Sequence, residues 1–105
     1  MKDLRQEGEN LNLEAFREEI DRLDHEMINV LKQRLELSKS IAEYKYENEL
    51  PIRDESREAE LILDRIKNVD DELMCEALKN ILEAVLHSSR LVQEHQIAKI
   101  KNDQK

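Results

Sequence analysis

Two cations stand on the side of a predicted helix that should be buried. From Leu13 to Tyr44, every third or fourth residue is apolar, which is the pattern of the core-facing stripe of one long amphipathic helix. Arg34 interrupts this stripe, and Lys45 follows on the same face about three helical turns later. An unpaired buried guanidinium is costly, so we expect Arg34 to meet either a carboxylate of the protein or an anionic ligand.

Two further pairs of polar residues have the four-residue spacing that places side chains one above the other on a helix. Ser89 and Gln93 form a neutral pair that continues an apolar face. Asp54 and Glu58 form an acidic pair, with Arg57 beside them. These groups could hydrogen-bond a polar ligand. The alternatives are ordinary interface contacts for the neutral pair and an exposed charged face for the acidic one.

The residues between the two cations on this face, Ser38 and Ala42, are small, and they predict a hollow between Arg34 and Lys45. Arg17 stands about 25 Å before Arg34 along the same helix axis. It therefore cannot contact the same small ligand within one chain. In an antiparallel dimer, Arg17 could reach the site of the second copy.

Three helices must position these residues, and no strand is expected. One Gly, one Pro and 40% charged residues are typical of an all-α chain. The sequence predicts helices at about 13–48, 55–68 and 71–97, where Pro51 closes the first helix and Asp54 caps the second.

The predicted organisation is one helical domain over residues 13–97. A polar lead-in at 1–12, capped at Asn12, precedes it, and a charged tail at 98–105 follows it. The first helix would be roughly 54 Å long, whereas a globule of this size is only about 33 Å across. Because the apolar stripe continues along the helix, we expect a second copy of the chain to cover the excess and form an intertwined homodimer.

Composition limits the partners and the compartment. The formal net charge of −8 argues against nucleic acid and anionic membranes as partners, and no stretch is apolar enough to span a membrane. Cys75 is the only cysteine, and His25, His87 and His95 lack metal-ligand spacing, so no internal disulfide, metal site or cofactor is predicted. A lone cysteine and a polar start without a signal peptide favour the cytoplasm.

In their order and spacing, these residues resemble the all-helical (AroQ-type) chorismate mutases. The resemblance extends from about Leu13 to Gln93 and is far more specific as an ordered set than in any one fragment. The motifs are L-x-x-x-R-x-x-I-D-x-L-D (Leu13 to Asp24), Q-R (Gln33 and Arg34) with Lys45 at its spacing, P-I-R-D-x-x-R-E (Pro51 to Glu58) and S-x-x-x-Q (Ser89 to Gln93).

The resemblance implies an isomerase of phenylalanine and tyrosine biosynthesis that rearranges chorismate to prephenate within one molecule, without metal or cofactor. This substrate is a dianion with two carboxylates, a ring hydroxyl and an ether oxygen. By similarity, Arg34 and the partner chain's Arg17 hold the two carboxylates, to which guanidinium forks are suited. Lys45 and Gln93 would donate hydrogen bonds to the ether oxygen.

The resemblance also implies roles for the remaining polar residues. Ser89 would assist at a carboxylate, and Asp54 and Glu58 would bind the ring hydroxyl. Arg57 would line the site and balance the charge of these two carboxylates.

Two other functions stay open for this sequence. The same cationic clamp could serve a lyase that eliminates pyruvate from isochorismate. A non-catalytic helical dimer, acting as a regulatory module, is the third possibility. Such a module would have no reason to keep Arg34, Lys45 and Gln93 on inward faces.

Overall fold

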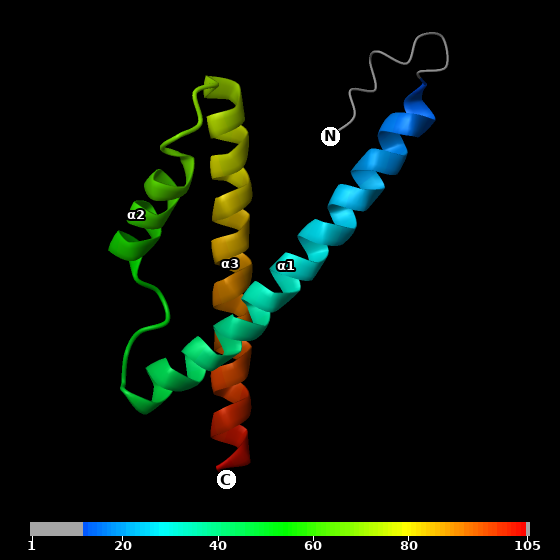
Figure 1. Cartoon of the computed structure of the whole chain (residues 1–105). Helices are drawn as coiled ribbons and strands as arrows, with labels where there is room; N and C mark the ends of the chain where they lie inside the picture. The colour runs from blue at the N-terminus through cyan, green and yellow to red at the C-terminus, as the bar shows by residue number, and fades with distance from the viewer. Residues whose placement is uncertain (1–11, 105) are drawn as a thin grey trace. The chain divides into compact units, whose positions relative to one another are not determined.

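The computed structural model describes residues 12–104, and these form three α-helices and no strand (Figure 1). Helix α1 spans Leu13–Glu47, α2 spans Glu55–Ile66 and α3 spans Glu72–Asp103. The predicted all-α class is therefore confirmed. The predicted lead-in lies outside the described residues, apart from residue 12. The chain divides into two compact units, one ending at Arg34 and one spanning Leu35–Lys105.

The described part of the first unit is α1 up to Arg34. The Asn12 side chain accepts a hydrogen bond from the backbone N–H of Ala15 at 3.0 Å, which confirms the predicted cap. The large apolar side chains of the predicted stripe are exposed here, from 40% for Phe16 to 61% for Val30. The set is Leu13, Phe16, Ile20, Leu23, Met27 and Val30.

Helix α1 ends in a tight backbone motif rather than at Pro51 itself. The N–H of Leu50 donates to the carbonyl of Lys45 at 2.8 Å, and the N–H of Glu49 donates to the carbonyl of Tyr46 at 3.3 Å. This is the hydrogen-bond pattern of a Schellman motif, which requires a left-handed residue. Glu49 takes that place with φ of 55°, where glycine would be the less strained choice.

Aspartate side chains begin both remaining helices. Asp54 accepts from the backbone N–H of Arg57 and caps α2, as the sequence predicts. Asp71 accepts from the backbone N–H groups of Leu73 and Met74 and caps α3. These caps fix where α2 and α3 start, and thereby the register of the side chains that each helix presents.

The predicted end of the third helix, near residue 97, is wrong. Helix α3 continues to Asp103, so most of the segment predicted as a charged tail is helical. No Gly or Pro interrupts residues 94–103. Two side-chain bonds also tie this end to α1, from Gln96 to Glu43 at 2.9 Å and from the Tyr46 hydroxyl to Gln104 at 3.0 Å.

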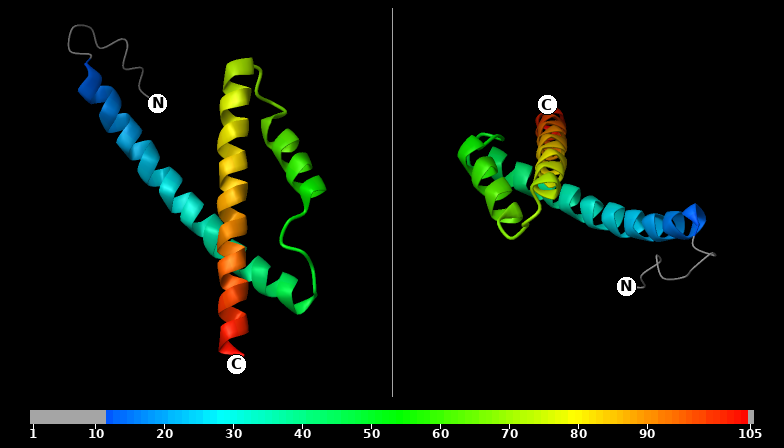
Figure 2. Two further views of the ribbon diagram at one scale, coloured as in Figure 1. Left: turned by 180° about the vertical axis from the view of Figure 1, so that it is seen from behind. Right: turned by 90° about the horizontal axis from the view of Figure 1, so that it is seen from above.

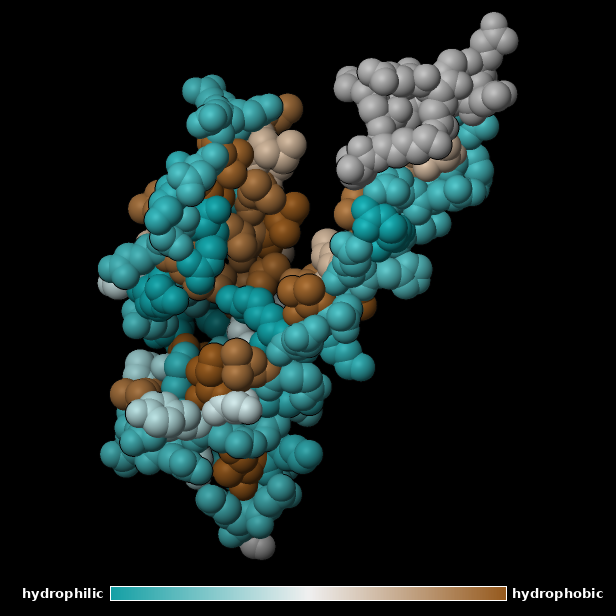
Figure 3. Space-filling model, viewed as in Figure 1, coloured by the Kyte–Doolittle hydropathy of each residue, from teal (hydrophilic) through white to brown (hydrophobic). Residues whose placement is uncertain are grey.

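In the second unit, α2 lies beside the first half of α3 (Figures 1 and 2). The last turns of α1 cross the second half of α3. Leu61 of α2 and Leu86 of α3 are buried, as is Ala42 of α1. Other apolar side chains of α3 stay open to solvent, notably Leu73 and Ile81, and Figure 3 shows apolar surface along this helix.

Ser38 and Ala42, the small residues of the predicted face between Arg34 and Lys45, are packed against other side chains. Ser38 is 2% exposed and Ala42 is completely covered. Ser38 also hydrogen-bonds Ser89 of α3, at the crossing of the two helices. Small side chains let helix backbones approach closely, and here they serve that packing.

Candidate functional site

Four polar side chains from α1 and α3 form one hydrogen-bonded cluster in the second unit. Lys45 Nζ donates to Gln93 Oε1 at 3.1 Å, and Gln93 Nε2 donates to Ser89 Oγ at 3.4 Å. Ser89 Oγ lies 2.6 Å from Ser38 Oγ. Ser38, Ser89 and Gln93 are all buried, and Lys45 is half-buried. The predicted alignment of Ser89 with Gln93 is therefore present, and Lys45 of another helix joins them.

The cluster keeps donor capacity for a ligand. An ammonium group has three N–H donors, and Lys45 uses one for Gln93 and one for the carbonyl of Ile52 at 2.5 Å. Gln93 uses one of its two amide N–H groups. Among residues 12–104, one N–H of each side chain therefore has no acceptor. Because the two side chains are in contact, both remaining donors can serve one oxygen atom.

The bond from Lys45 to Ile52 also holds the loop between α1 and α2 against the cluster. This loop and the start of α2 border a pocket of about 340 Å³, lined by Lys45, Asp54 and Arg53 among others. Asp54 thus caps α2 and lies on the wall of the same pocket as Lys45.

Glu58 has a different cationic partner from the one expected. Its Oε1 lies 2.6 Å from NH1 of Arg90 on α3 and 3.8 Å from Nε of Arg53. Arg57, predicted to balance this charge, has an exposed side chain, and its backbone N–H bonds Asp54. Sequence reasoning missed Arg90. Its position four residues after the buried Leu86 was the available signal, because that spacing places it on the packed face of α3.

A second pocket, of about 370 Å³, lies between α2 and α3. Glu58 and Arg90 line it together with the apolar side chains of Ile62 and Leu86. Arg53 and Glu55 belong to the walls of both pockets, so the two hollows adjoin. Cationic, acidic and apolar groups meet here, as a small polar substrate with a carbon ring requires.

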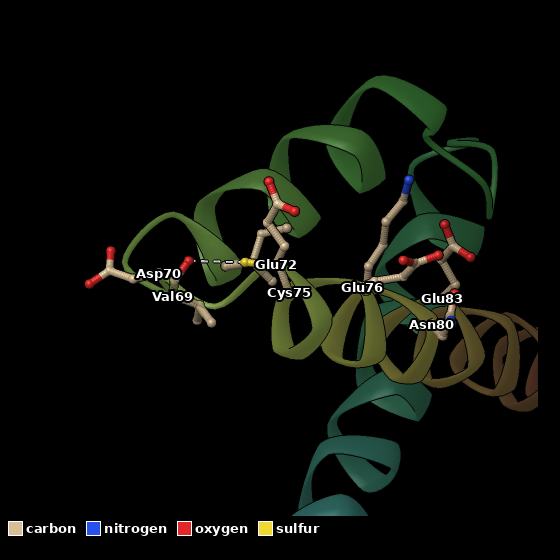
Figure 4. A pocket seen from close by; sticks show the side chains of 9 residues that line it. Val69, Asp70, Glu72, Cys75, Glu76, Asn80 and Glu83 are labelled. Carbon is tan, nitrogen blue, oxygen red and sulfur yellow. Dashed lines mark hydrogen bonds between the residues drawn. The ribbon is translucent and has the colours of Figure 1, made fainter.

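A third pocket, at the start of α3, has the opposite charge character (Figure 4). Its volume is about 460 Å³ and it contains none of the predicted site residues. Its wall carries four carboxylates and one ammonium group, those of Asp70, Glu72, Glu76 and Glu83 and that of Lys79. The Cys75 thiol donates to the carbonyl of Val69. A dianion would be repelled by this wall, so we exclude the pocket as the site.

Arg17 and Arg34 belong to the first unit. Arg17 is exposed and Arg34 is half-buried. The roles of Arg17 and Arg34 in binding a ligand stay predictions.

Two classes of feature are missing from residues 12–104. They contain no cluster of three or more His, Cys, Asp or Glu side chains that could hold a metal ion. None of their helices is long and apolar enough to cross a membrane.

Comparisons with known proteins show the family of this chain. The model of the family described as chorismate mutase type II matches residues 16–94. The chain is also 31% identical over 94 residues to a bifunctional chorismate mutase/prephenate dehydratase of Buchnera aphidicola subsp. Schizaphis graminum (strain Sg). That alignment covers 88% of the chain but only 24% of the relative, so the chain spans about a quarter of its length.

No solved structure matches the chain at a significant level. The family match nevertheless covers most of the sequence, including every predicted site residue from Arg17 to Gln93. It confirms the resemblance read from the motifs, and the chain belongs to the chorismate mutase type II family.

Proposed function

We propose that this chain catalyses the rearrangement of chorismate to prephenate, as an isomerase of aromatic amino-acid biosynthesis. The observation that carries the proposal is the contact between Lys45 and Gln93, in which one N–H of each has no acceptor among residues 12–104. The family to which the chain belongs supports the choice of substrate.

The reaction needs no nucleophile, because one molecule exchanges a C–O bond for a C–C bond. Cleavage of the C–O bond runs ahead of C–C bond formation, so negative charge grows on the ether oxygen. Two fixed donors aimed at that oxygen bind the transition state more tightly than the substrate. Lys45 brings a cation from α1 and Gln93 a neutral amide from α3.

The substrate must also be held in a compact conformation with its reacting carbons close together. We assign this task to the two carboxylate contacts, made by Arg34 with help from Ser89 and by the partner's Arg17. Ser89 supports the assignment because it is buried next to Gln93. Selecting one conformer is a proximity effect, and with the donors it should supply the roughly 8 kcal/mol that a 10⁶-fold acceleration requires.

We assign the binding of the ring hydroxyl to the acidic residues at the start of α2. Asp54 lines the pocket with Lys45, and Glu58 lines the adjoining pocket. Both carboxylates can accept a hydrogen bond from a neutral hydroxyl without adding charge at the reacting oxygen. Arg57 is proposed to line the site from its solvent side, since this residue is exposed.

We further propose that two copies form an intertwined dimer with two equivalent sites. The six large apolar side chains of the predicted stripe in the first unit are at least 40% exposed, and a second copy would cover them. A single helical domain that begins at residue 13 and a cytoplasmic location are parts of the same proposal.

The direct test is to incubate the purified chain with chorismate and follow the loss of its ultraviolet absorbance. Parallel incubation with isochorismate, followed by a pyruvate assay, tests the lyase alternative. Prephenate from chorismate, with little pyruvate from isochorismate, supports the proposal. A chain that forms neither product contradicts it.

The variant Gln93→Glu tests the donor at the ether oxygen. A protonated carboxyl can donate, but an ionised one cannot, so its rate should fall as pH rises from about 4 to 7. Gln93→Met, which has no N–H donor at any pH, is the matched control and should be slow across the whole range. A Gln93→Glu profile equal to the parent's would remove Gln93 from the reacting centre.

A further inference from the structure

Arg90 of α3 and Glu58 of α2 form an enclosed ion pair. NH1 of Arg90 donates to Glu58 Oε1 at 2.6 Å, and the two side chains are 19% and 17% exposed. The pair of Arg65 with Asp64, by contrast, is about half exposed on both sides. Surface pairs of the second kind contribute little, whereas an enclosed pair holds both partners in place.

Arg90 is also adjacent to the polar cluster. It follows Ser89 directly on α3 and lies on the packed side of the helix, four residues after Leu86. From there its side chain crosses to α2, where Glu58 sits one turn after the cap Asp54. Arg90 thus links the helix that carries Ser89 and Gln93 to the helix that carries the acidic pair.

The pairing leaves one oxygen of Glu58 available. Both cations near this carboxylate, Arg90 and Arg53, contact Oε1. Within residues 12–104, Oε2 has no hydrogen-bond donor. The pocket of about 370 Å³ between α2 and α3 is lined by Glu58 and Arg90 themselves. A donor that enters this pocket would find an acceptor whose orientation is already set.

We propose that Arg90 is a positioning residue: it locks Oε1 of Glu58 so that Oε2 accepts the ring hydroxyl of the substrate, and it thereby selects for substrates that carry this hydroxyl. The inference rests on the proposed function. A free glutamate side chain samples several rotamers, so binding a hydroxyl would first have to order it. The bond to Arg90 restricts that motion before the substrate arrives.

The test compares chorismate with an analogue that lacks only the ring hydroxyl. Arg90→Met removes the cation at similar length, and kcat/KM for chorismate should fall about tenfold, mainly through KM. For the analogue the loss should stay below about twofold, because no hydroxyl is left to orient. Equal losses for both substrates would overturn the proposal, since a merely structural role affects them alike.

Combination with Glu58→Ala shows whether Arg90 acts through Glu58. In the Glu58→Ala chain, Arg90→Met should cost nothing further, because the residue that it positions is gone. A further loss as large as in the parent would mean that Arg90 contacts the substrate itself. Arg65→Met, from the exposed pair on α2, is the matched control and should leave both substrates unaffected.

Crystal structures of the parent and of Arg90→Met separate failure of this inference from failure of the proposed function. If the parent does not rearrange chorismate, the proposed function fails. The structures still decide whether Arg90 positions Glu58, since its carboxylate should turn away once Arg90 is replaced. An unchanged Glu58 carboxylate would overturn the positioning role whatever the activity.

Discussion

The two units of this chain differ in what they bury, although both expose large apolar side chains. In the first unit, the six large apolar residues of the predicted stripe, from Leu13 to Val30, are 40% to 61% exposed, and no residue of 12–34 is buried. In the second unit, the buried side chains are polar as often as apolar, with Ser38, Ser89 and Gln93 beside Ala42, Leu61 and Leu86. A protein stabilised by its own core alone would show neither feature.

This contrast assigns different tasks to the two regions. Fully burying a large apolar side chain is worth about 1.5–3 kcal/mol, so the exposed stripe is a source of free energy for association. A buried polar group costs about 1–3 kcal/mol unless it is hydrogen-bonded, so the cluster in the second unit needs a complete set of partners. We infer that the apolar stripe of the first unit packs against another chain, and that the polar cluster of the second unit binds a ligand.

The largest expected effect is the loss of activity in Lys45→Ala. Removing the cationic donor should lower kcat by about 10²–10³ or more, as for a lost oxyanion donor. The matched control is Lys39→Ala on the same helix, whose ammonium group pairs with the exposed Glu36 at 3.3 Å. Steady-state kinetics with chorismate and circular dichroism on both variants provide the check. A Lys45→Ala chain within tenfold of the parent would break the proposed link between the cluster and catalysis.

A smaller loss should follow when the stripe is made polar. Ile20→Glu places a carboxylate in the surface that a second copy would cover, and an unpaired buried charge is strongly unfavourable. Sedimentation at micromolar concentration should show monomers, with activity reduced about tenfold or more. Asn29→Glu adds the same charge to the exposed helix outside the stripe and should stay dimeric. Dimeric Ile20→Glu would mean that the stripe is not the interface.

A moderate effect on stability alone is expected from the cap of α3. Asp71→Ala leaves the N–H groups of Leu73 and Met74 without their acceptor, at a cost of about 1 kcal/mol. Urea denaturation should record this loss, while activity of the folded protein should change little. Asp70→Ala, next to the cap but not part of it, is the control. Equal destabilisation by both variants would argue against the capping role.

The smallest effect is expected on the exposed face of α1. The hydrogen bond from Arg22, together with its charge, holds the pKa of Glu19 below its usual range. A depressed pKa in the folded state stabilises the protein above the ordinary pKa, and this contribution is lost as pH falls through the folded-state value. Arg22→Gln should raise the pKa of Glu19 toward its ordinary value, as measured by carbon NMR.

Stability at neutral pH should hardly change in Arg22→Gln, because the pair is solvent-exposed. Asp64 provides an internal control in the same titration. Its pKa is lowered by the hydrogen bonds from Lys67 and Arg65, which Arg22→Gln does not touch. A parallel shift of Asp64 would point to a global change rather than the loss of one pair.

Local signals made most of the fold predictable. Spacing of apolar residues, the cap at Asp54 and the breaker at Pro51 located three helices, and each of these signals lies within a few residues of what it determines. The end of α3 was missed because its last turns are held by Tyr46 and Glu43, which are more than 50 residues away in the sequence. No local pattern reports such contacts.

The same limit applies to the site. The spacing of Ser89 and Gln93 predicted their alignment, since one helix carries both. The pairing of Glu58 with Arg90, and the burial of Ser38 against α3, depend on how helices are rotated against each other. That rotation is set by packing rather than by periodicity, so sequence placed these residues on faces but could not name their partners.

The most direct test of the account mixes two inactive variants. If each site combines Lys45 of one chain with Arg17 of the other, Arg17→Ala and Lys45→Ala should each be nearly inactive alone. A mixed dimer has one site with both changes and one with neither, so random exchange of subunits should restore about a quarter of the parent's activity. A mixture that stays inactive, although labelled subunits are seen to exchange, would contradict a site shared between two copies.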